Sequence, residues 1–366
     1  MLFVVVVLVK LFGKYFLSLK IKFTIFLPVR NGGEHFRQCV ASILAQTYQE
    51  FSLVVLDNAS EDQNIEWLRN IGDPKVEIIE SSKPLSIEDN WARILTVPKH
   101  EFMTIIGHDD LLDPGYLEIM SNLIDKYPDA GLYQAHFRLI DGDGKFIRLC
   151  RKMPLKEREE EFLESRLLSK RDSFGTGFLF ASASYEKLGG IPLFEKLLYA
   201  DDALWLKLMH GSWKATSEKV CFSYRLHTQS TSYSPNWNAL FNALDCYLDT
   251  LEEMSRENDR IAEVVQKYLA TYVISFYRWF YFSARYQHKE VSVLRERIIL
   301  SSHKVNDLLN ELNMSVSNIF IKKMEKQIFS GLIYYLWWAK RLLAGLIKKM
   351  HTLSGPRENS CCESVK

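Results

Sequence analysis

The stretch Phe102-Met-Thr-Ile-Ile-Gly-His-Asp-Asp-Leu-Leu-Asp-Pro114 decides the fold of this chain. Its apolar run, residues 102–106, is short, partly β-branched and bounded by turn residues, which predicts a buried strand. Asp109 and Asp110 follow where that strand should end, and in open α/β sheets this edge borders the ligand crevice. The alternative is an N-cap, in which Asp110 or Asp113 caps a helix that begins near the end of the stretch.

Two adjacent carboxylates repel each other, so a divalent cation is a natural partner for this pair. Hard oxygen ligands suit Mg²⁺ or Mn²⁺, which keep several waters and accept further oxygens from the phosphates of a substrate. The sequence therefore predicts Mn²⁺ or Mg²⁺ as the cofactor.

Strands and helices alternate before this stretch. Apolar runs at 23–28, 51–56 and 76–79 alternate with helical periodicity at 34–46 and 87–95. This order predicts an α/β fold, Rossmann-like, with a mostly parallel sheet and helices on both faces. Polar residues follow the successive strands: Arg30 and Asn31, Asp57 and Asn58, Lys83, and the pair Asp109 and Asp110. Four such clusters at one sheet edge indicate a ligand crevice.

A second acidic pair, Asp201 and Asp202, stands at the predicted start of an apolar helix that contains Trp205. The helix dipole accounts for one carboxylate at an N-terminus but not for two. An ionised carboxylate aimed into the crevice is what a general base requires. A strand predicted at 220–226 ends in His227, for which a structural role and a metal-ligand role are both open.

Two other polar stretches have simpler interpretations. Asp141-Gly-Asp-Gly144 is predicted to be a hairpin turn, because a calcium loop would need a later acidic ligand at a fixed offset. The charged run at 156–171 is predicted to be a solvated helix or a mobile flap.

The composition limits the function classes. The chain has 366 residues, which is long enough for two structural units. Its 46 basic and 45 acidic residues give a net charge of +1, so no nucleic-acid-binding surface is implied. The six cysteines show no zinc-ligand spacing, which favours reduced thiols and a cytoplasmic location. The motifs G-x-G-x-x-G and G-x-x-x-x-G-K-[ST] are absent, which disfavours a dehydrogenase and a P-loop enzyme.

The two ends of the chain have their own character. Residues 1–21 form an apolar N-terminal segment, whose run at 2–9 is shorter than the ~20 residues that a bilayer span needs. From 233 to 353 the periodicity is helical, and 354–366 is a polar tail. The last candidate helix, 319–350, has an aromatic apolar centre flanked by lysines, which fits peripheral contact with the inner face of the cell membrane. Docking of this helix on residues 22–232 is the alternative.

Six short motifs stand in order along residues 22–232: Leu27-Pro-Val-Arg-Asn31, Cys39-Val-Ala-Ser-Ile-Leu-Ala-Gln-Thr-Tyr48, Val54-Val-Leu-Asp-Asn-Ala-Ser60, Gly107-His-Asp-Asp110, Ala200-Asp-Asp202 and Tyr224-Arg-Leu-His227. In this order they resemble the family 2 inverting glycosyltransferases of GT-A fold, of the type that builds bacterial cell-surface polysaccharides. The resemblance implies a GT-A domain that binds a nucleotide-sugar over residues 22–232, followed by an α-helical C-terminal region.

The resemblance also implies roles for individual residues. The positions expected beside the nucleotide-sugar are Pro28, Val29, Arg30, Asn31, Glu34, Asp57, Asn58, Ser60, Lys83, Asn90, His108 and Asp109. Within this set, Asp57 falls on the position that bonds the base. The metal ligands expected in the DXD region and at the C-terminal contact are Asp109, Asp110 and His227. Asp202 falls on the catalytic base, with Asp201 as the neighbouring candidate.

Gly107 stands where the family often has aspartate, so the resemblance leaves open which of Asp109 and Asp110 binds the metal directly. The implied reaction is a single displacement from a nucleotide-sugar, with UDP- or dTDP-sugars favoured, to a saccharide or lipid-linked hydroxyl. Two alternatives remain: a degenerate GT-A protein that binds a sugar or partner without catalysis, and a nucleotidyltransferase. The nucleotidyltransferase would be expected to carry a Gly-rich basic loop after its first strand, where this chain has only Arg30-Asn-Gly-Gly33.

Overall fold

The computed structural model describes residues 20–227, 237–286, 291–312, 326, 328 and 329. The apolar N-terminal run and nearly all of the predicted membrane helix at 319–350 lie outside the described residues. The chain divides into two compact units, Met1–Val264 and Val265–Lys366. The first unit therefore extends past residue 232, where the sequence places the end of the GT-A domain, and that finer boundary stays a prediction.

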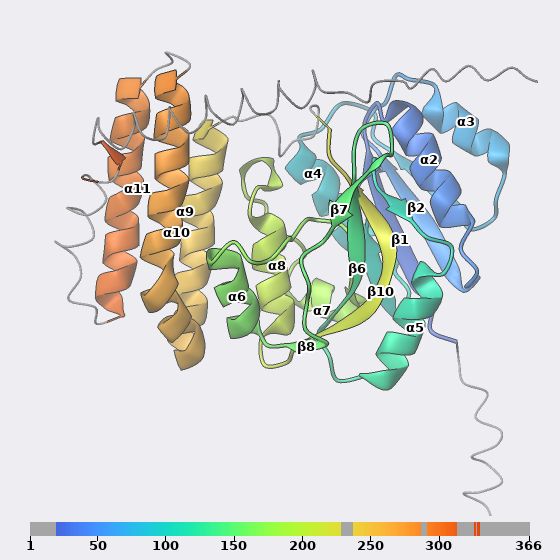
Figure 1. The fold of residues 1–366 in the computed structure, drawn as a ribbon. Helices are drawn as coiled ribbons and strands as arrows, with labels where there is room; N and C mark the ends of the chain where they lie inside the picture. Colours follow the sequence, from blue (N-terminus) through green and yellow to red (C-terminus); the bar gives the residue numbers. More distant parts are fainter. Residues whose placement is uncertain (1–19, 228–236, 287–290, 313–325, 327, 330–366) are drawn as a thin grey trace, which may run out of the picture. The chain divides into compact units, whose positions relative to one another are not determined.

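The sheet of the first unit begins with four parallel strands, in the spatial order β3-β2-β1-β4 (Figure 1). Their bounds are Phe23–Val29 for β1, Phe51–Asp57 for β2, Val76–Glu80 for β3 and Phe102–Ile105 for β4. All seven residues of β1 are buried, as expected for a strand covered on both faces. This half of the sheet has the predicted β-α-β order, so its carboxyl ends meet at one edge.

The other half of the sheet is mixed. β9 (Phe178–Ala181) runs antiparallel to both β4 and β6 (Leu132–Ile140), and β6 runs parallel to β10 (Lys214–Arg225). The remaining strands add antiparallel pairings: β5 (Leu111–Leu112), β7 (Phe146–Leu149) and β8 (Lys156–Glu157). The predicted α/β class is confirmed, and the predicted parallel arrangement holds for the β3-β2-β1-β4 half.

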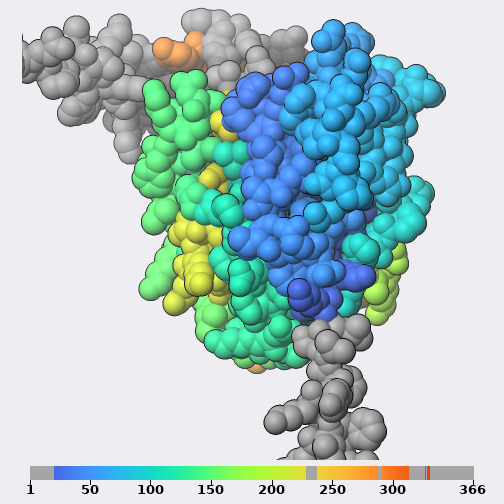
Figure 2. All heavy atoms as spheres, turned by 90° about the vertical axis from the view of Figure 1, so that its right-hand side faces the viewer, coloured from blue at the N-terminus to red at the C-terminus, as the bar shows by residue number. Residues whose placement is uncertain are grey.

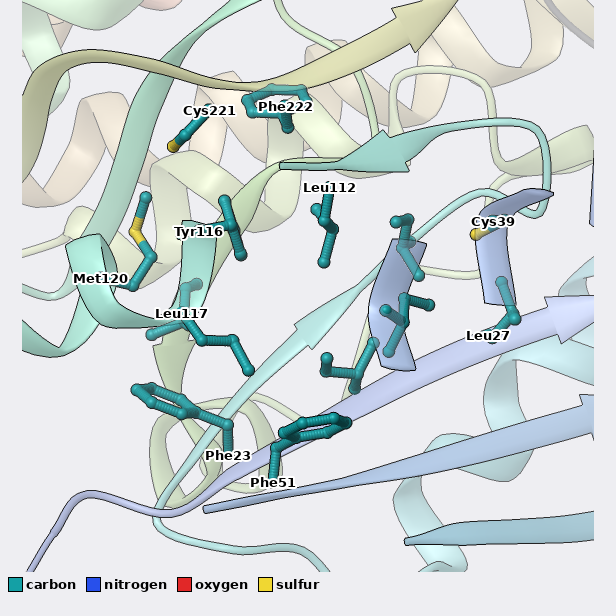
Figure 3. Close-up of a cluster of buried hydrophobic side chains, with 14 of the residues drawn as sticks. Phe23, Leu27, Cys39, Phe51, Leu112, Tyr116, Leu117, Met120, Cys221 and Phe222 are labelled. Carbon is teal, nitrogen blue, oxygen red and sulfur yellow. The ribbon is translucent and has the colours of Figure 1, made fainter. Parts of the chain in front are cut away.

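Helices pack on the sheet around a large cluster of buried apolar side chains. The helices and 3-10 turns of the first unit are α2 (Gly33–Leu44), α3 (Asn64–Ile71), α4 (Ile87–Ala92), η1 (Arg93–Thr96), α5 (Tyr116–Lys126), α6 (Glu159–Leu167), α7 (Ser182–Lys187), η2 (Glu195–Leu197), α8 (Ala200–Met209) and α9 (Trp237–Glu257). Figure 3 shows Phe23, Phe51, Leu117 and Phe222 in this core, contributed by β1, β2, α5 and β10. The core fixes the strands whose ends carry the polar clusters.

The charged run at 156–171 forms a helix, α6, as expected, but it is neither fully solvated nor a flap. Phe162, Leu163 and Leu167 are buried, and so are Glu157 and Arg171, which form an ion pair. Because these charges are paired with each other, they can be buried without an isolated charge in the interior. This segment is therefore part of the packed domain.

Helix α10 (Asp259–Tyr286) begins in the first unit and continues into the second, where α11 (Val291–Glu311) follows. The Tyr277 hydroxyl donates to the Ser301 hydroxyl at 2.7 Å, which joins the two helices through buried polar groups. The predicted helical character is confirmed for the described parts of this region, residues 237–286 and 291–312. Among the described residues, no helix combines the length and apolar character that crossing a bilayer requires.

Candidate functional site

The loops after β1 and β2 are tied together at the sheet edge. The Asn31 N–H donates to the Ser60 hydroxyl at 2.9 Å, and the Asn31 side-chain oxygen accepts from the Glu61 N–H at 2.8 Å. Asn31 has a positive φ of 51°, which asparagine tolerates better than most residues. In Figure 2 the darker blue segment, which includes the loop after β1, adjoins the lighter blue segment, which includes the loop after β2. Asn31 and Ser60 therefore shape the rim of the site by bonding to each other's loop.

Asp57, the last residue of β2, is only 2% exposed. Its two carboxylate oxygens accept from the Ser60 N–H at 3.3 and 3.2 Å. A carboxylate has about four lone-pair positions, so this arrangement leaves acceptor capacity at the carboxyl end of the strand. Asp57 can therefore accept a hydrogen bond from a ligand while the loop holds it in place.

Asn58 and Asn90 have their amide groups engaged within the protein. Asn58 donates to the Leu85 carbonyl at 3.0 Å and accepts from the Leu85 N–H at 2.7 Å. Asn90 donates to the Leu56 carbonyl at 3.3 Å and accepts from Arg93 at 2.8 Å. Both side chains therefore brace the end of β2 against the segment that contains α4 and η1. Of the other residues expected beside the nucleotide-sugar, Pro28 and Val29 are buried, and Arg30, Glu34 and Lys83 are exposed.

Arg93 belongs to the same hydrogen-bond network as Asn90, and it was not singled out from the sequence. Its guanidinium donates to the carbonyls of Asp57 at 2.9 Å and Ile79 at 2.6 Å, besides the Asn90 side chain. These bonds fasten the ends of β2 and β3 to η1. The only sequence signal would have been an arginine three residues after Asn90, at helical spacing.

The first acidic pair is divided into a buried and a more exposed carboxyl. Asp110 is 1% exposed, accepts from the Arg225 N–H at 2.9 Å and is hydrogen-bonded to Thr176. Burial and the neighbouring charge of Asp109 raise the Asp110 pKa well above its usual range. Asp110 therefore braces the turn. The N-cap interpretation is wrong, because α5 begins after Gly115 without a side-chain cap.

Asp109 has the opposite environment. Its Oδ2 lies 2.6 Å from Nε2 of His227, and both side chains keep about a sixth of their surface exposed, at 18% and 17%. The family often has an aspartate at position 107, and the local packing explains why this chain has glycine there. A Cβ at this position would meet Asp109 Oδ1 at 2.9 Å and Asp110 Oδ2 at 3.2 Å, so a side chain would crowd the pair.

The buried Arg225 anchors the turn that contains Asp109 and Asp110. It was not assigned a functional role from the sequence, although it lies in the Tyr224-Arg-Leu-His227 motif. It is 2% exposed, and its guanidinium donates to the Asp109 carbonyl at 2.7 Å and the Gly142 carbonyl at 3.1 Å. Gly142 lies in the hairpin turn predicted at 141–144, which the structure confirms by the bond from the Gly144 N–H to the Asp141 carbonyl. Arg225 thus connects the Asp109 backbone to the β6–β7 hairpin.

The predicted metal ligands fit a cation in part. Among the described residues, no three His, Cys, Asp or Glu side chains are arranged to hold a metal ion. Asp109 and His227 supply one carboxylate oxygen and one imidazole nitrogen, and the Asp110 carboxyl is turned to bonds within the protein. Mn²⁺ accepts imidazole as well as oxygen ligands. A cation here would need water and substrate phosphate for its other positions, as Mg²⁺ and Mn²⁺ commonly do.

Two further histidines lie near this pair. The rings of His35 and His227 are 5.5 Å apart between centroids, and His35 Nε2 lies 3.0 Å from the Gly142 carbonyl. Burial lowers the pKa of His108, with Asp109 acting in the opposite direction. The surroundings of Asp109 are therefore rich in imidazole.

The second acidic pair is divided in the same way. Asp202 is 4% exposed and accepts two bonds from Arg166, at 3.0 Å from Nε and 2.5 Å from Nη2. Its other oxygen, Oδ1, is buried and makes no hydrogen bond among the described residues. Asp201 is partly exposed, and its Oδ1 accepts from the Asp202 N–H at 2.9 Å. Desolvation and the charge of Asp202 raise the pKa of Asp201 to about 7.

Two contacts bring this pair toward the edge that carries Asp109. Trp205, one turn after Asp201, stacks on Phe178 with ring centroids 4.2 Å apart. Phe178 opens β9, and the antiparallel pairing of Thr104 with Leu179 puts that end beside the end of β4. Just before α8, the Lys196 N–H donates to Glu88 of α4 at 2.5 Å. The segment before α8 thus contacts α4, whose Asn90 accepts from the Arg93 side chain that holds the Asp57 carbonyl.

Comparison with known proteins identifies the class. Residues 24–189 match the model of glycosyl transferase family 2. An uncharacterized glycosyltransferase of Rickettsia typhi is 26% identical over 229 residues, which span 61% of this chain and 68% of the relative. Glycosyltransferase GlyG of Streptococcus pneumoniae is 22% identical over 125 residues, 34% of this chain and 42% of the relative.

The crystal structure of S. aureus TarS residues 1–349 in complex with UDP-GlcNAc aligns with a TM-score of 0.65 at 13% identity. The alignment covers 84% of this chain and 91% of the TarS chain, and it shows the shared fold. Fold and family model agree with the resemblance found in the sequence. Residues 24–189 therefore form a family 2 glycosyltransferase domain, and the fold is GT-A.

Proposed function

We propose that this glycosyltransferase moves a sugar from a nucleoside-diphosphate donor to a hydroxyl acceptor, with inversion and with the help of a divalent cation. The observation that carries the proposal is the partly exposed Asp201, which stands beside the buried, arginine-paired Asp202. A base that must gain a proton near neutral pH works best with a pKa near that pH. The raised pKa of Asp201, about 7, meets this requirement.

The donor is proposed from the β1–β2 edge. Asp57 accepts a hydrogen bond from the base of the nucleotide, and the loop tie between Asn31 and Ser60 keeps that carboxylate in place. Support comes from the fold shared with TarS, whose structure was determined with UDP-GlcNAc. A UDP- or dTDP-sugar is the favoured donor, because the imide N–H of uracil or thymine can donate to a carboxylate.

Asp109 and His227 are the residues that would hold the cation. Once bound there, the cation would offset the negative charge of the diphosphate leaving group. Asp110 keeps the turn folded from within, through Thr176 and the Arg225 N–H. Arg225 holds the Asp109 carbonyl and so fixes the direction of the backbone at this point.

The base is assigned to Asp201 rather than to Asp202, the residue that the family resemblance favours. Asp202 already accepts two bonds from Arg166, and its remaining oxygen is sealed from solvent. An acceptor hydroxyl could not reach it without rearrangement of α6 or α8. Asp201 takes the proton from the acceptor hydroxyl, and Asp202 keeps a negative charge beside it that favours proton uptake.

The acceptor is proposed to be a saccharide or a lipid-linked oligosaccharide, in the synthesis of a surface polysaccharide. The protein would act in the cytoplasm, at the inner face of the cell membrane, with contact through residues 319–350. The basic residues and aromatic side chains of that segment support this proposal.

The test is a panel of nucleotide-sugars, measured by thermal shift with Mn²⁺, with Mg²⁺ and with EDTA. A UDP- or dTDP-sugar should raise the melting temperature more with Mn²⁺ than with EDTA. The binding donor is then incubated with candidate acceptors, and the anomeric configuration of the product is read by NMR. A product that retains the donor's configuration would reject the single displacement, and equal shifts in Mn²⁺ and EDTA would reject the metal site.

A further inference from the structure

Strand β7 exposes an unusual run of apolar side chains. Phe146 is 62% exposed, Ile147 47% and Leu149 53%, and all four residues of the strand are exposed. Neighbouring residues of a strand point to opposite faces, so β7 presents apolar groups on both sides. In the described sheet it pairs with β6 alone. The strand is therefore a projecting edge of the molecule.

Basic residues surround these apolar groups. Residues 144–156 contain Lys145, Arg148, Arg151, Lys152 and Lys156, and no acidic residue. Three of the five have partners. Arg148 donates twice to Asp172 at 2.8 Å, the Arg151 N–H donates to the same carboxylate at 2.8 Å, and Lys156 lies 4.3 Å from the centre of the Trp213 ring. Lys145 and Lys152 are exposed. On the turn before the strand, Asp141 bonds to backbone N–H groups and Asp143 is exposed, so the positive charge gathers on the strand side.

We propose that the β7 surface, residues 145–152, docks on an anionic lipid surface. Apolar side chains among cations are what the headgroup layer of such a membrane accepts, since the chains enter the acyl boundary while the cations meet phosphate. A projecting edge strand allows both faces to be buried at once. This inference does not depend on the transfer reaction or on residues 319–350.

A second copy of the chain fits this surface less well. Pairing two β7 edges would bring the net positive charge around Lys145 and Lys152 of one copy near that of the other, and like charges across paired strands are destabilising. An anionic bilayer has the complementary charge. The surface also continues into the site, because the hairpin turn before β7 contacts Arg225 and His35 through the Gly142 carbonyl. A lipid-linked acceptor held in that bilayer would be close to the Asp109 turn.

The first experiment places a reporter in the strand of the full chain. Phe146→Trp is mixed with phosphatidylglycerol vesicles that contain brominated lipid, and quenching is compared with that of the unsubstituted chain, which has eight tryptophans. Ile71→Trp, at a 42% exposed position on α3, is the matched control. The proposal expects additional quenching for Phe146→Trp alone. Vesicle binding without additional quenching at position 146 would assign the contact to another segment and overturn the proposal.

The second experiment weakens each component of the surface. The double variants Lys145→Glu/Lys152→Glu and Phe146→Ser/Ile147→Ser should each reduce co-sedimentation with phosphatidylglycerol vesicles at least about tenfold, since one basic residue near such a surface contributes roughly fivefold. Lys187→Glu and Ile71→Ser, at exposed positions elsewhere, should bind as the parent does. Circular dichroism checks that the variants are folded. Unchanged vesicle binding, or a dimer without lipid that these variants dissociate, would overturn the proposal.

Discussion

The two acidic pairs of this protein are built on the same plan with different partners. In each pair one carboxyl is buried and one is partly exposed. The buried Asp110 is held by neutral donors, the Arg225 N–H and the Thr176 hydroxyl, and its pKa is raised. The buried Asp202 is held by the Arg166 guanidinium. The comparison teaches that the buried carboxyl of each pair supports its partly exposed neighbour. Asp110 shapes the turn that presents Asp109, and Asp202 places a negative charge beside Asp201.

The largest expected effect is on the second pair, through Asp201→Asn. This variant should lower kcat by about 10²- to 10⁴-fold, the range contributed by general base catalysis, with donor binding nearly unchanged. Initial rates and calorimetric titration with the donor measure the two quantities. A rate near that of the parent protein would return the base to Asp202, and equal loss of rate and donor binding would indicate a structural role.

Arg166→Met should be the most destabilising change. It leaves the Asp202 carboxylate buried without its guanidinium partner, and breaking a buried pair in this way costs about 3–5 kcal/mol. Urea unfolding measures the loss. Adding Asp202→Asn to Arg166→Met should recover part of the stability, because the unpaired charge is removed. A double variant as unstable as the two single changes summed would contradict the pairing.

The two members of the first pair, Asp109 and Asp110, should differ in how strongly their substitution weakens metal-dependent donor binding. Asp109→Asn should weaken Mn²⁺-dependent donor binding by at least roughly tenfold, since even outer partners of metal ligands contribute 10- to 100-fold. Asp110→Asn should change it by less than about twofold, because the carboxyl is turned inward, where it accepts from the Arg225 N–H and is hydrogen-bonded to Thr176. Donor titrations with and without Mn²⁺ test both. The reverse order would make Asp110 the metal ligand.

The smallest expected effect is a change in pH dependence. Because Asp201 acts in its ionised form, the rate should rise with pH through about 7 and level off above it. Asp202→Asn removes a neighbouring negative charge and frees the positive charge of Arg166, and both changes lower the pKa of Asp201. The rise should therefore move to lower pH, by about one unit. An unmoved profile would exclude electrostatic coupling between the two aspartates.

Much of the fold was predictable because it depends on local patterns. The buried run at 102–106, the alternation of strands with helices before it and the hairpin turn at 141–144 all follow from side-chain periodicity and turn chemistry. The mixed half of the sheet was not predictable in this way. β9 has four residues, and such a short run does not indicate which strands it will join.

The sequence by itself indicated the alternation of strands and helices in the first half, the strand ends at which Asp57, Asp109 and Asp110 stand, and the resemblance to family 2 glycosyltransferases. Only the tertiary structure decided which carboxyl of each pair is buried and which partner it has. Arg166 lies 36 residues before Asp202, and Arg225 lies 115 residues after Asp110. The physical reason is that the charge state of a buried carboxyl depends on desolvation and on neighbours that folding brings from distant parts of the chain.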